Sequence, residues 1–125
     1  MVDQDSAAVG ATCGPDAVSC GVELTGVFRL LGKRWSGMIV GTLLQRPARF
    51  GELAKAIPGI SDSVLNERLR ELMAAGLIQR QLADGPTTAV LYQLTAAGLD
   101  FRVAFDELRA WAARNQLGAG ATYGS

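Results

Sequence analysis

A set of short polar side chains and one arginine occupies one side of the segment GISDSVLNERLRELMAAGLIQR, residues 59–80. At about 100° per residue, Leu65, Leu69 and Leu72 share one face of a helix, and the polar residues share the opposite face. The polar face holds Ser63, Glu67 and Arg70, flanked by Asn66 and Asp62. Ser61, the expected N-cap of this helix, is a further DNA-binding candidate. Such side chains can hydrogen-bond base edges in a DNA major groove, but an ordinary solvated helix face carries the same residue types.

Other candidates for chemistry are few. The chain has no histidine, which excludes histidine-based catalytic triads and histidine metal sites. Cys13 and Cys20 cannot form a structural zinc site alone, and a reducing cytoplasm disfavours a permanent disulfide between them. There is no phosphate-binding glycine loop, and the adjacent carboxylates Asp106 and Glu107 point apart on a helix. We therefore expect no enzymatic activity, no cofactor and no metal.

Charge is distributed unevenly along a chain whose net charge is zero. Residues 1–28 hold four acids and no base, whereas residues 29–80 hold nine bases and four acids. A local concentration of arginine and lysine can attract phosphate even on a neutral protein. The candidate phosphate contacts are Lys33, Arg34, Arg49 and Arg80, together with Thr87 and Thr88 near a predicted turn.

The hydrophobic spacing predicts a mainly helical fold with one small β-hairpin. Helical periodicity occurs in residues 22–31, 35–43, 51–57, 61–75 and from Thr95 onward, and alternation in residues 77–83 and 89–94 predicts two strands. The residues 48–50 could add a very short strand. Two short helices joined by a turn that holds Pro58 and Gly59, followed by a hairpin, form a winged helix-turn-helix. We assign this domain to residues 19–116, between a flexible arm, 1–18, and a flexible tail, 117–125.

Two features of the predicted domain allow more than one interpretation. Arg68 lies close to the leucine face, so it either pairs with a carboxylate such as Glu52 or contacts DNA. Aromatic residues from three of the predicted helices could meet in a ligand pocket or could simply be core. They are Phe28, Trp35, Phe105 and Trp111.

Nothing in the sequence suggests a membrane protein. No apolar run reaches the ~20 residues that a membrane-spanning helix needs. The N-terminus is acidic and lacks a basic region followed by an apolar block, so we expect no secretory signal, no membrane contact and a cytoplasmic location.

Three segments resemble the HxlR-type family of bacterial transcriptional regulators, which are relatives of the MarR-type winged helices. They are CGVELTGVFRLLGKRWSGMIVGTLL, RFGELAKAIPGISDSVLNERLRELMAAGLIQR and YQLTAAGLDF. The resemblance implies a homodimer formed through the first and last helices, bound to a pseudo-palindromic operator in double-stranded DNA. It also implies a repressor that responds to a small-molecule effector or to electrophile or redox stress. The zero net charge favours an alternative, a winged-helix protein-interaction module without DNA binding.

The family resemblance also singles out Cys20. Members often carry a cysteine just before the first helix, and in some of them it senses electrophiles, quinones or oxidants. A thiol at a helix N-terminus can be more reactive than usual. The acidic neighbours Asp16 and Glu23, and Gly21 in place of the usual proline, favour the alternative of an unreactive small residue.

Overall fold

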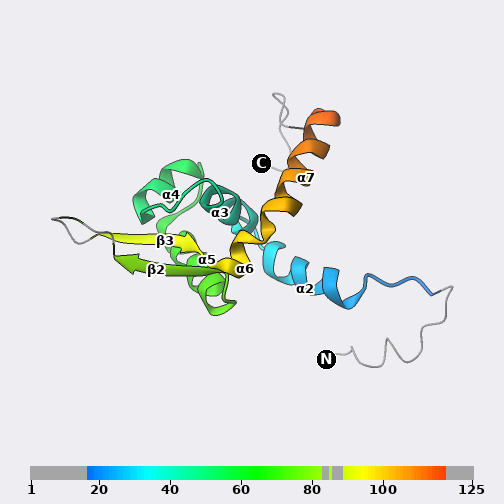
Figure 1. Ribbon diagram of the computed structural model, residues 1–125, viewed down its shortest axis with the longest axis horizontal. Helices are drawn as coiled ribbons and strands as arrows, with labels where there is room; N and C mark the ends of the chain where they lie inside the picture. The colour runs from blue at the N-terminus through cyan, green and yellow to red at the C-terminus, as the bar shows by residue number, and fades with distance from the viewer. Residues whose placement is uncertain (1–16, 83–84, 86–88, 118–125) are drawn as a thin grey trace.

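The computed structural model describes residues 17–82, 85 and 89–117, and its helices and strands follow the predicted order (Figure 1). Their bounds are α2 Val22–Leu31, α3 Ser36–Leu43, α4 Phe50–Ala56, α5 Asp62–Ala74, β2 Ile78–Leu82, β3 Val90–Leu94, α6 Ala96–Leu99 and α7 Phe101–Arg114. The helices α4 and α5 form the helix-turn-helix, and β2 with β3 forms the wing. The predicted winged helix-turn-helix fold is confirmed. Nearly all of the predicted arm and tail lies outside the described residues.

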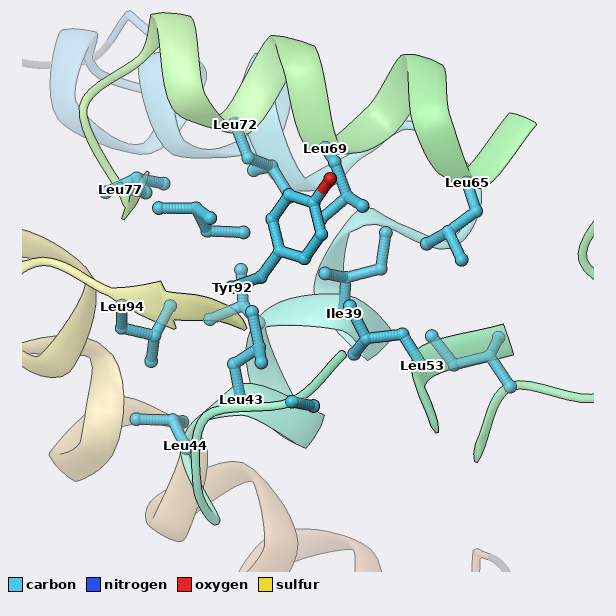
Figure 2. Packing of buried hydrophobic residues seen from close by; sticks show 14 residues of the cluster. Ile39, Leu43, Leu44, Leu53, Leu65, Leu69, Leu72, Leu77, Tyr92 and Leu94 are labelled. Atoms are coloured by element: carbon cyan, nitrogen blue, oxygen red, sulfur yellow. The ribbon is translucent and has the colours of Figure 1, made fainter. Parts of the chain in front are cut away.

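The core is built around the leucine face of α5. Leu65, Leu69 and Leu72 are all 0% exposed. Figure 2 shows these side chains pointing from α5 toward Ile39 of α3 and Tyr92 of β3. Complete burial of a leucine contributes about 1.5–3 kcal/mol to stability. This packing fixes which side of α5 faces inward and leaves the polar side outward.

Both ends of α5 follow from local sequence. At the start, the Ser61 side chain accepts a hydrogen bond from the backbone N–H of Val64 at 3.2 Å, as predicted for an N-cap. At the end, Gly76 has a φ of 81°, and the N–H of Leu77 bonds to the carbonyl of Leu72 at 3.0 Å. This arrangement satisfies a free carbonyl of the last turn, and glycine adopts the left-handed conformation at little cost.

The wing is a two-stranded antiparallel hairpin with one added bridge. Ile78 pairs with Leu94 at its base, and Leu82 pairs with Val90 at its outer end. The predicted short strand at 48–50 is reduced to Ala48, which exchanges backbone hydrogen bonds of 3.0 and 2.8 Å with Tyr92. The residues 83–84 and 86–88, which include Thr87 and Thr88, lie outside the described residues.

The predicted last helix is divided in two. Thr95 caps only α6, where its Oγ accepts a hydrogen bond from the N–H of Gly98 at 3.3 Å, and a separate helix, α7, begins at Phe101. Hydrophobic spacing did not reveal the break at Asp100. The division arises from packing, because Gly98 is buried against the core whereas α7 has no buried residue and projects away from the wing (Figure 1).

None of the described helices has the length and apolar character needed to cross a lipid bilayer.

Candidate nucleic-acid interface

The polar side of α5 is open to solvent. All six candidate base-reading residues are exposed. Four of them lie on the side of α5 opposite the three buried leucines: Ser63, Asn66, Glu67 and Arg70. Ser61 also has a structural role, because its side chain caps α5 and lies 3.3 Å from the Ser63 hydroxyl. Asp62, Asn66 and Arg70 extend this face along the helix. It is the face that a helix-turn-helix presents to a DNA groove.

The basic candidates fall into two groups. Arg49, at the start of α4, and Arg80, in β2, are exposed, and neither forms an ion pair within the described residues. Lys33, in contrast, lies 2.9 Å from a carboxylate oxygen of Glu71. The guanidinium carbon of Arg34 lies 4.4 Å from the centroid of the Trp35 ring. Lys33 and Arg34 are therefore already engaged within the protein.

Arg68 contacts the protein interior, but not through the predicted partner. Its side chain is 17% exposed and lies 3.2 Å from Glu71 and 3.6 Å from Glu67. Its Nε also donates to the backbone carbonyl of Arg34 at 3.2 Å. The prediction of Glu52 as its partner was wrong, because α4 places Glu52 beside other donors.

Glu52 holds the first turn of α4 in place. One of its oxygens lies 3.0 Å from Arg46, and the other accepts the backbone N–H of Arg49 at 2.8 Å. The hydrogen bond from Arg46, followed by that N–H, lowers the pKa of Glu52 below its usual range. The pKa of Glu71 is likewise lowered, chiefly by the hydrogen bond from Lys33. Both carboxylates therefore stay ionised, and their charges are balanced by Arg46 and Lys33.

A second feature is an apolar groove of about 540 Å³ between α2 and α7. Three of the four predicted pocket aromatics, Phe28, Phe105 and Trp111, line this groove, but Trp35 does not. Trp35 instead packs against the core near the helix-turn-helix turn, where a Cβ atom added at Gly59 would lie 3.4 Å from its ring. The sequence therefore predicted most of the groove but placed one aromatic residue in the wrong group.

Sequence reasoning missed other parts of the groove. The remaining lining residues are Leu24, Val27, Leu31, Phe101, Ala104, Glu107, Leu108 and Arg114. Leu108 is 62% exposed and Phe28 is 61% exposed, although their helical spacing resembles that of core residues. The available signal was the excess of apolar positions on the last helix. The sequence did not show that this face lacks a partner within the described chain.

Cys20 is exposed and precedes Gly21, the N-cap of α2, whose φ is 88°. Cys13 lies outside the described residues. Within the part of the chain that the structure describes, no group of three or more His, Cys, Asp or Glu side chains is placed to hold a metal ion.

A solvent-exposed polar helix held in a helix-turn-helix and followed by a hairpin defines the class of winged helix-turn-helix proteins. Residues 30–118 match the family model described as HxlR-like helix-turn-helix. The chain therefore belongs to the HxlR-like helix-turn-helix family. Cys20 lies before the matched residues.

Known proteins agree with this assignment. The chain is 40% identical over 90 residues to the HTH-type transcriptional regulator YodB of Bacillus subtilis (strain 168), covering 72% of this chain and 80% of YodB. It is also similar to the crystal structure of quinone-bound YodB, with a TM-score of 0.65, 38% identity, and coverage of 75% and 98% of the two chains. A protein described as a MarR-family transcriptional regulator from Porphyromonas gingivalis W83 gives a TM-score of 0.69 at 27% identity, covering 79% and 97%.

Proposed function

We propose that this chain is a sequence-specific, DNA-binding transcriptional regulator of the cytoplasm. The observation that carries the proposal is the orientation of α5, whose leucines are buried while the opposite polar residues are exposed. A helix presented in this way fits the major groove of duplex DNA, where polar side chains distinguish base pairs. The family membership and the similarity to YodB support the same function.

The side chains divide into base-reading and phosphate-binding sets. Ser63, Asn66 and Arg70 read base edges, because they are exposed on the groove-facing side of α5. Asp62 and Glu67 flank them and disfavour sites that place phosphate nearby. Most phosphate contacts come from Arg49 and Arg80, which form no ion pair within the described residues.

The protein acts as a homodimer held by α2 and α7. Both helices lack buried residues in the described chain, yet they carry exposed apolar side chains such as Phe28, Leu108 and Trp111. A second copy that packs its own α2 and α7 into the apolar groove would cover these surfaces. Two α5 helices would then read half-sites about 34–36 Å apart on one face of the DNA, which is one helical turn.

We propose that the protein represses transcription when it is bound to DNA. An electrophile or another small molecule regulates this binding. Cys20 is exposed at the start of α2, one of the two helices that line the groove. Its relative YodB has been solved in a quinone-bound form, which supports a thiol-reactive effector class for this chain. Modification of Cys20 would change the start of α2 and hence the dimer, which sets the spacing of the two α5 helices.

Binding-site selection from random duplex DNA tests the main proposal. The purified protein should enrich a palindrome with half-sites about 10–10.5 base pairs apart, and affinity should fall steeply as salt is raised. A wild-type protein that enriches no sequence and gives no salt-sensitive gel shift with genomic fragments would contradict DNA binding. That result would favour the protein-interaction module.

A further inference from the structure

The connection between α2 and α3 has an unusual backbone. Trp35 has a φ of 83°, a left-handed conformation that costs a residue with a side chain about 1 kcal/mol or more. Such a conformation persists only where the surroundings hold it. The Trp35 ring packs against the core and under the Arg34 guanidinium, and the next residue, Ser36, is 2% exposed. The connection is therefore held in one position.

A closed set of polar contacts joins this connection to α5. Lys33 Nζ lies 2.9 Å from Glu71 Oε2, and Arg68 lies 3.2 Å from Glu71 Oε1. Arg68 Nε then donates to the carbonyl of Arg34, the residue next to Lys33, at 3.2 Å. Both oxygens of Glu71 are thus used, and α5 is tied twice to the same short segment. We call Lys33, Arg68 and Glu71 the Glu71 cluster.

The Glu71 cluster lies between two surfaces with different proposed roles. On α5, Arg68 lies 3.6 Å from Glu67, which is exposed on the base-reading side. On the other side, the connection continues into α2, which lines the apolar groove. Leu30 and Leu31, at the end of α2, pack against the core, whereas no residue of α2 is fully buried. The Glu71 cluster therefore links α5 to the connection that directly follows α2.

We propose that Lys33, Arg68 and Glu71 are positioning residues, which fix the orientation of α5 relative to α2 so that the base-reading side chains meet the DNA correctly. This inference rests on the proposed DNA-binding function. It assigns Lys33 a role through Glu71 rather than a direct contact with phosphate. It also makes α5 sensitive to displacement of α2 at the groove.

The substitution Glu71→Gln distinguishes two roles of Glu71, because an effect of its charge alone and a positioning role predict opposite changes in operator affinity. Removing a carboxylate near DNA strengthens binding if charge alone matters, because phosphate repulsion decreases. Loss of positioning instead weakens binding to the selected operator by about five- to tenfold, a typical coupling for groups in one network. Partly exposed ion pairs contribute little to global stability, so the unfolding temperature should change only slightly.

Asp106→Asn is the matched control. It removes the same charge from another i,i+3 ion pair, with Arg109 at 3.0 Å, on a helix that carries no member of the Glu71 cluster. Fluorescence anisotropy with the selected operator and a scrambled duplex should show lost discrimination for Glu71→Gln and none for Asp106→Asn. Operator affinity of Glu71→Gln equal to or tighter than that of wild type would overturn the proposal.

A double-mutant cycle tests whether Lys33 acts through Glu71. Lys33→Gln and Glu71→Gln should each lower the affinity for the operator. The double variant should bind the operator at least as tightly as the single variant with the lower affinity. If the fold-loss of affinity in the double variant equals the product of the two single fold-losses, Lys33 contacts DNA itself, and its positioning role is overturned.

Hydrogen exchange on the free protein tests the positioning without DNA. Backbone amides in residues 66–75 should exchange about fivefold faster in Glu71→Gln than in wild type or Asp106→Asn. Unchanged exchange would overturn the proposal. If wild type enriches no DNA sequence, the DNA-binding function fails, and this measurement alone decides whether the Glu71 cluster holds α5.

Discussion

Gly98 packs directly against the main-chain carbonyl of Leu77. A Cβ atom at position 98 would overlap with that oxygen and would press on the Leu94 side chain. Leu77 follows α5 and Leu94 ends β3, so Gly98 brings α6 into contact with both the segment after α5 and the wing. The same Leu77 carbonyl accepts the N–H of Thr95 at 2.9 Å, which places the start of α6.

The substitution Gly98→Ala should therefore destabilise the domain by about 1–3 kcal/mol, because the added methyl overpacks a buried contact. Urea unfolding followed by circular dichroism measures the change. Gly51→Ala is the control, since nothing lies within 4 Å of a Cβ atom at this exposed helical position. It should be neutral or stabilising by up to about 1 kcal/mol. Equal stability of Gly98→Ala and wild type would contradict the packing described.

Arg70→Ala should weaken binding to the selected operator by about 1–3 kcal/mol and relax sequence preference, because a base contact is lost. Arg49→Ala, in contrast, should weaken operator and scrambled duplex about equally and reduce the salt dependence by about one phosphate contact. Anisotropy titrations at several salt concentrations separate the two effects. Wild-type affinity and specificity for Arg70→Ala would remove it from the base-reading set.

Leu108→Asp should convert the proposed dimer into a folded monomer. Leu108 lines the apolar groove and is 62% exposed in the single chain, so the aspartate is tolerated in the monomer but not in an apolar interface. Sedimentation velocity measures the molecular mass. Ala113→Asp, on the same helix but outside the groove lining, should leave the mass unchanged. A wild-type monomer, or a Leu108→Asp protein with the wild-type mass, would refute the proposed interface.

Cys20→Ser should abolish the response to thiol-reactive compounds. Treatment of the wild-type complex with benzoquinone should add the quinone to the Cys20 sulfur and release the operator, because the start of α2 is altered. Cys13→Ser should respond as wild type does. Mass spectrometry identifies the modified residue, and gel shift follows the release. Operator release with Cys20 unmodified would show that another site senses the electrophile.

Acid should destabilise the protein through Glu52 and Glu71. Hydrogen bonds from Arg46 and Lys33, respectively, lower the pKa of these carboxyls, so both lower the folding free energy while ionised. Their contribution is present above the ordinary glutamate pKa and is lost as pH falls through the lowered values. Thermal unfolding from about pH 6 to about pH 3 should show a slightly smaller decrease in Glu71→Gln than in wild type, because this ion pair is partly exposed.

Glu23→Gln is the control for this pH dependence, since Glu23 is exposed in the first turn of α2, lies outside the groove lining and forms no ion pair within the described residues. Its unfolding temperature should fall with acid in parallel with that of wild type. A Glu71→Gln curve that is also parallel to wild type would show that the Lys33 contact does not contribute to stability.

The sequence by itself determined the class of fold and most of the secondary structure. Leu65, Leu69 and Leu72 specify the inner face of α5, and Ser61 and Gly76 specify its ends, because caps and helical periodicity act over one or two turns. The exposed polar side follows directly from the buried leucines. Local signals were therefore sufficient to locate the candidate base-reading residues.

Only the tertiary structure decided how distant residues pair and which apolar residues remain uncovered. Sequence spacing placed Arg68 near the core but could not choose between Glu52 and Glu71, because the choice depends on how α4 and the α2–α3 connection pack around α5. Trp35 and Trp111 likewise look alike in sequence, yet one packs near Gly59 and the other lines the groove. Periodicity describes one helix at a time, whereas ion pairs and grooves depend on where several helices meet.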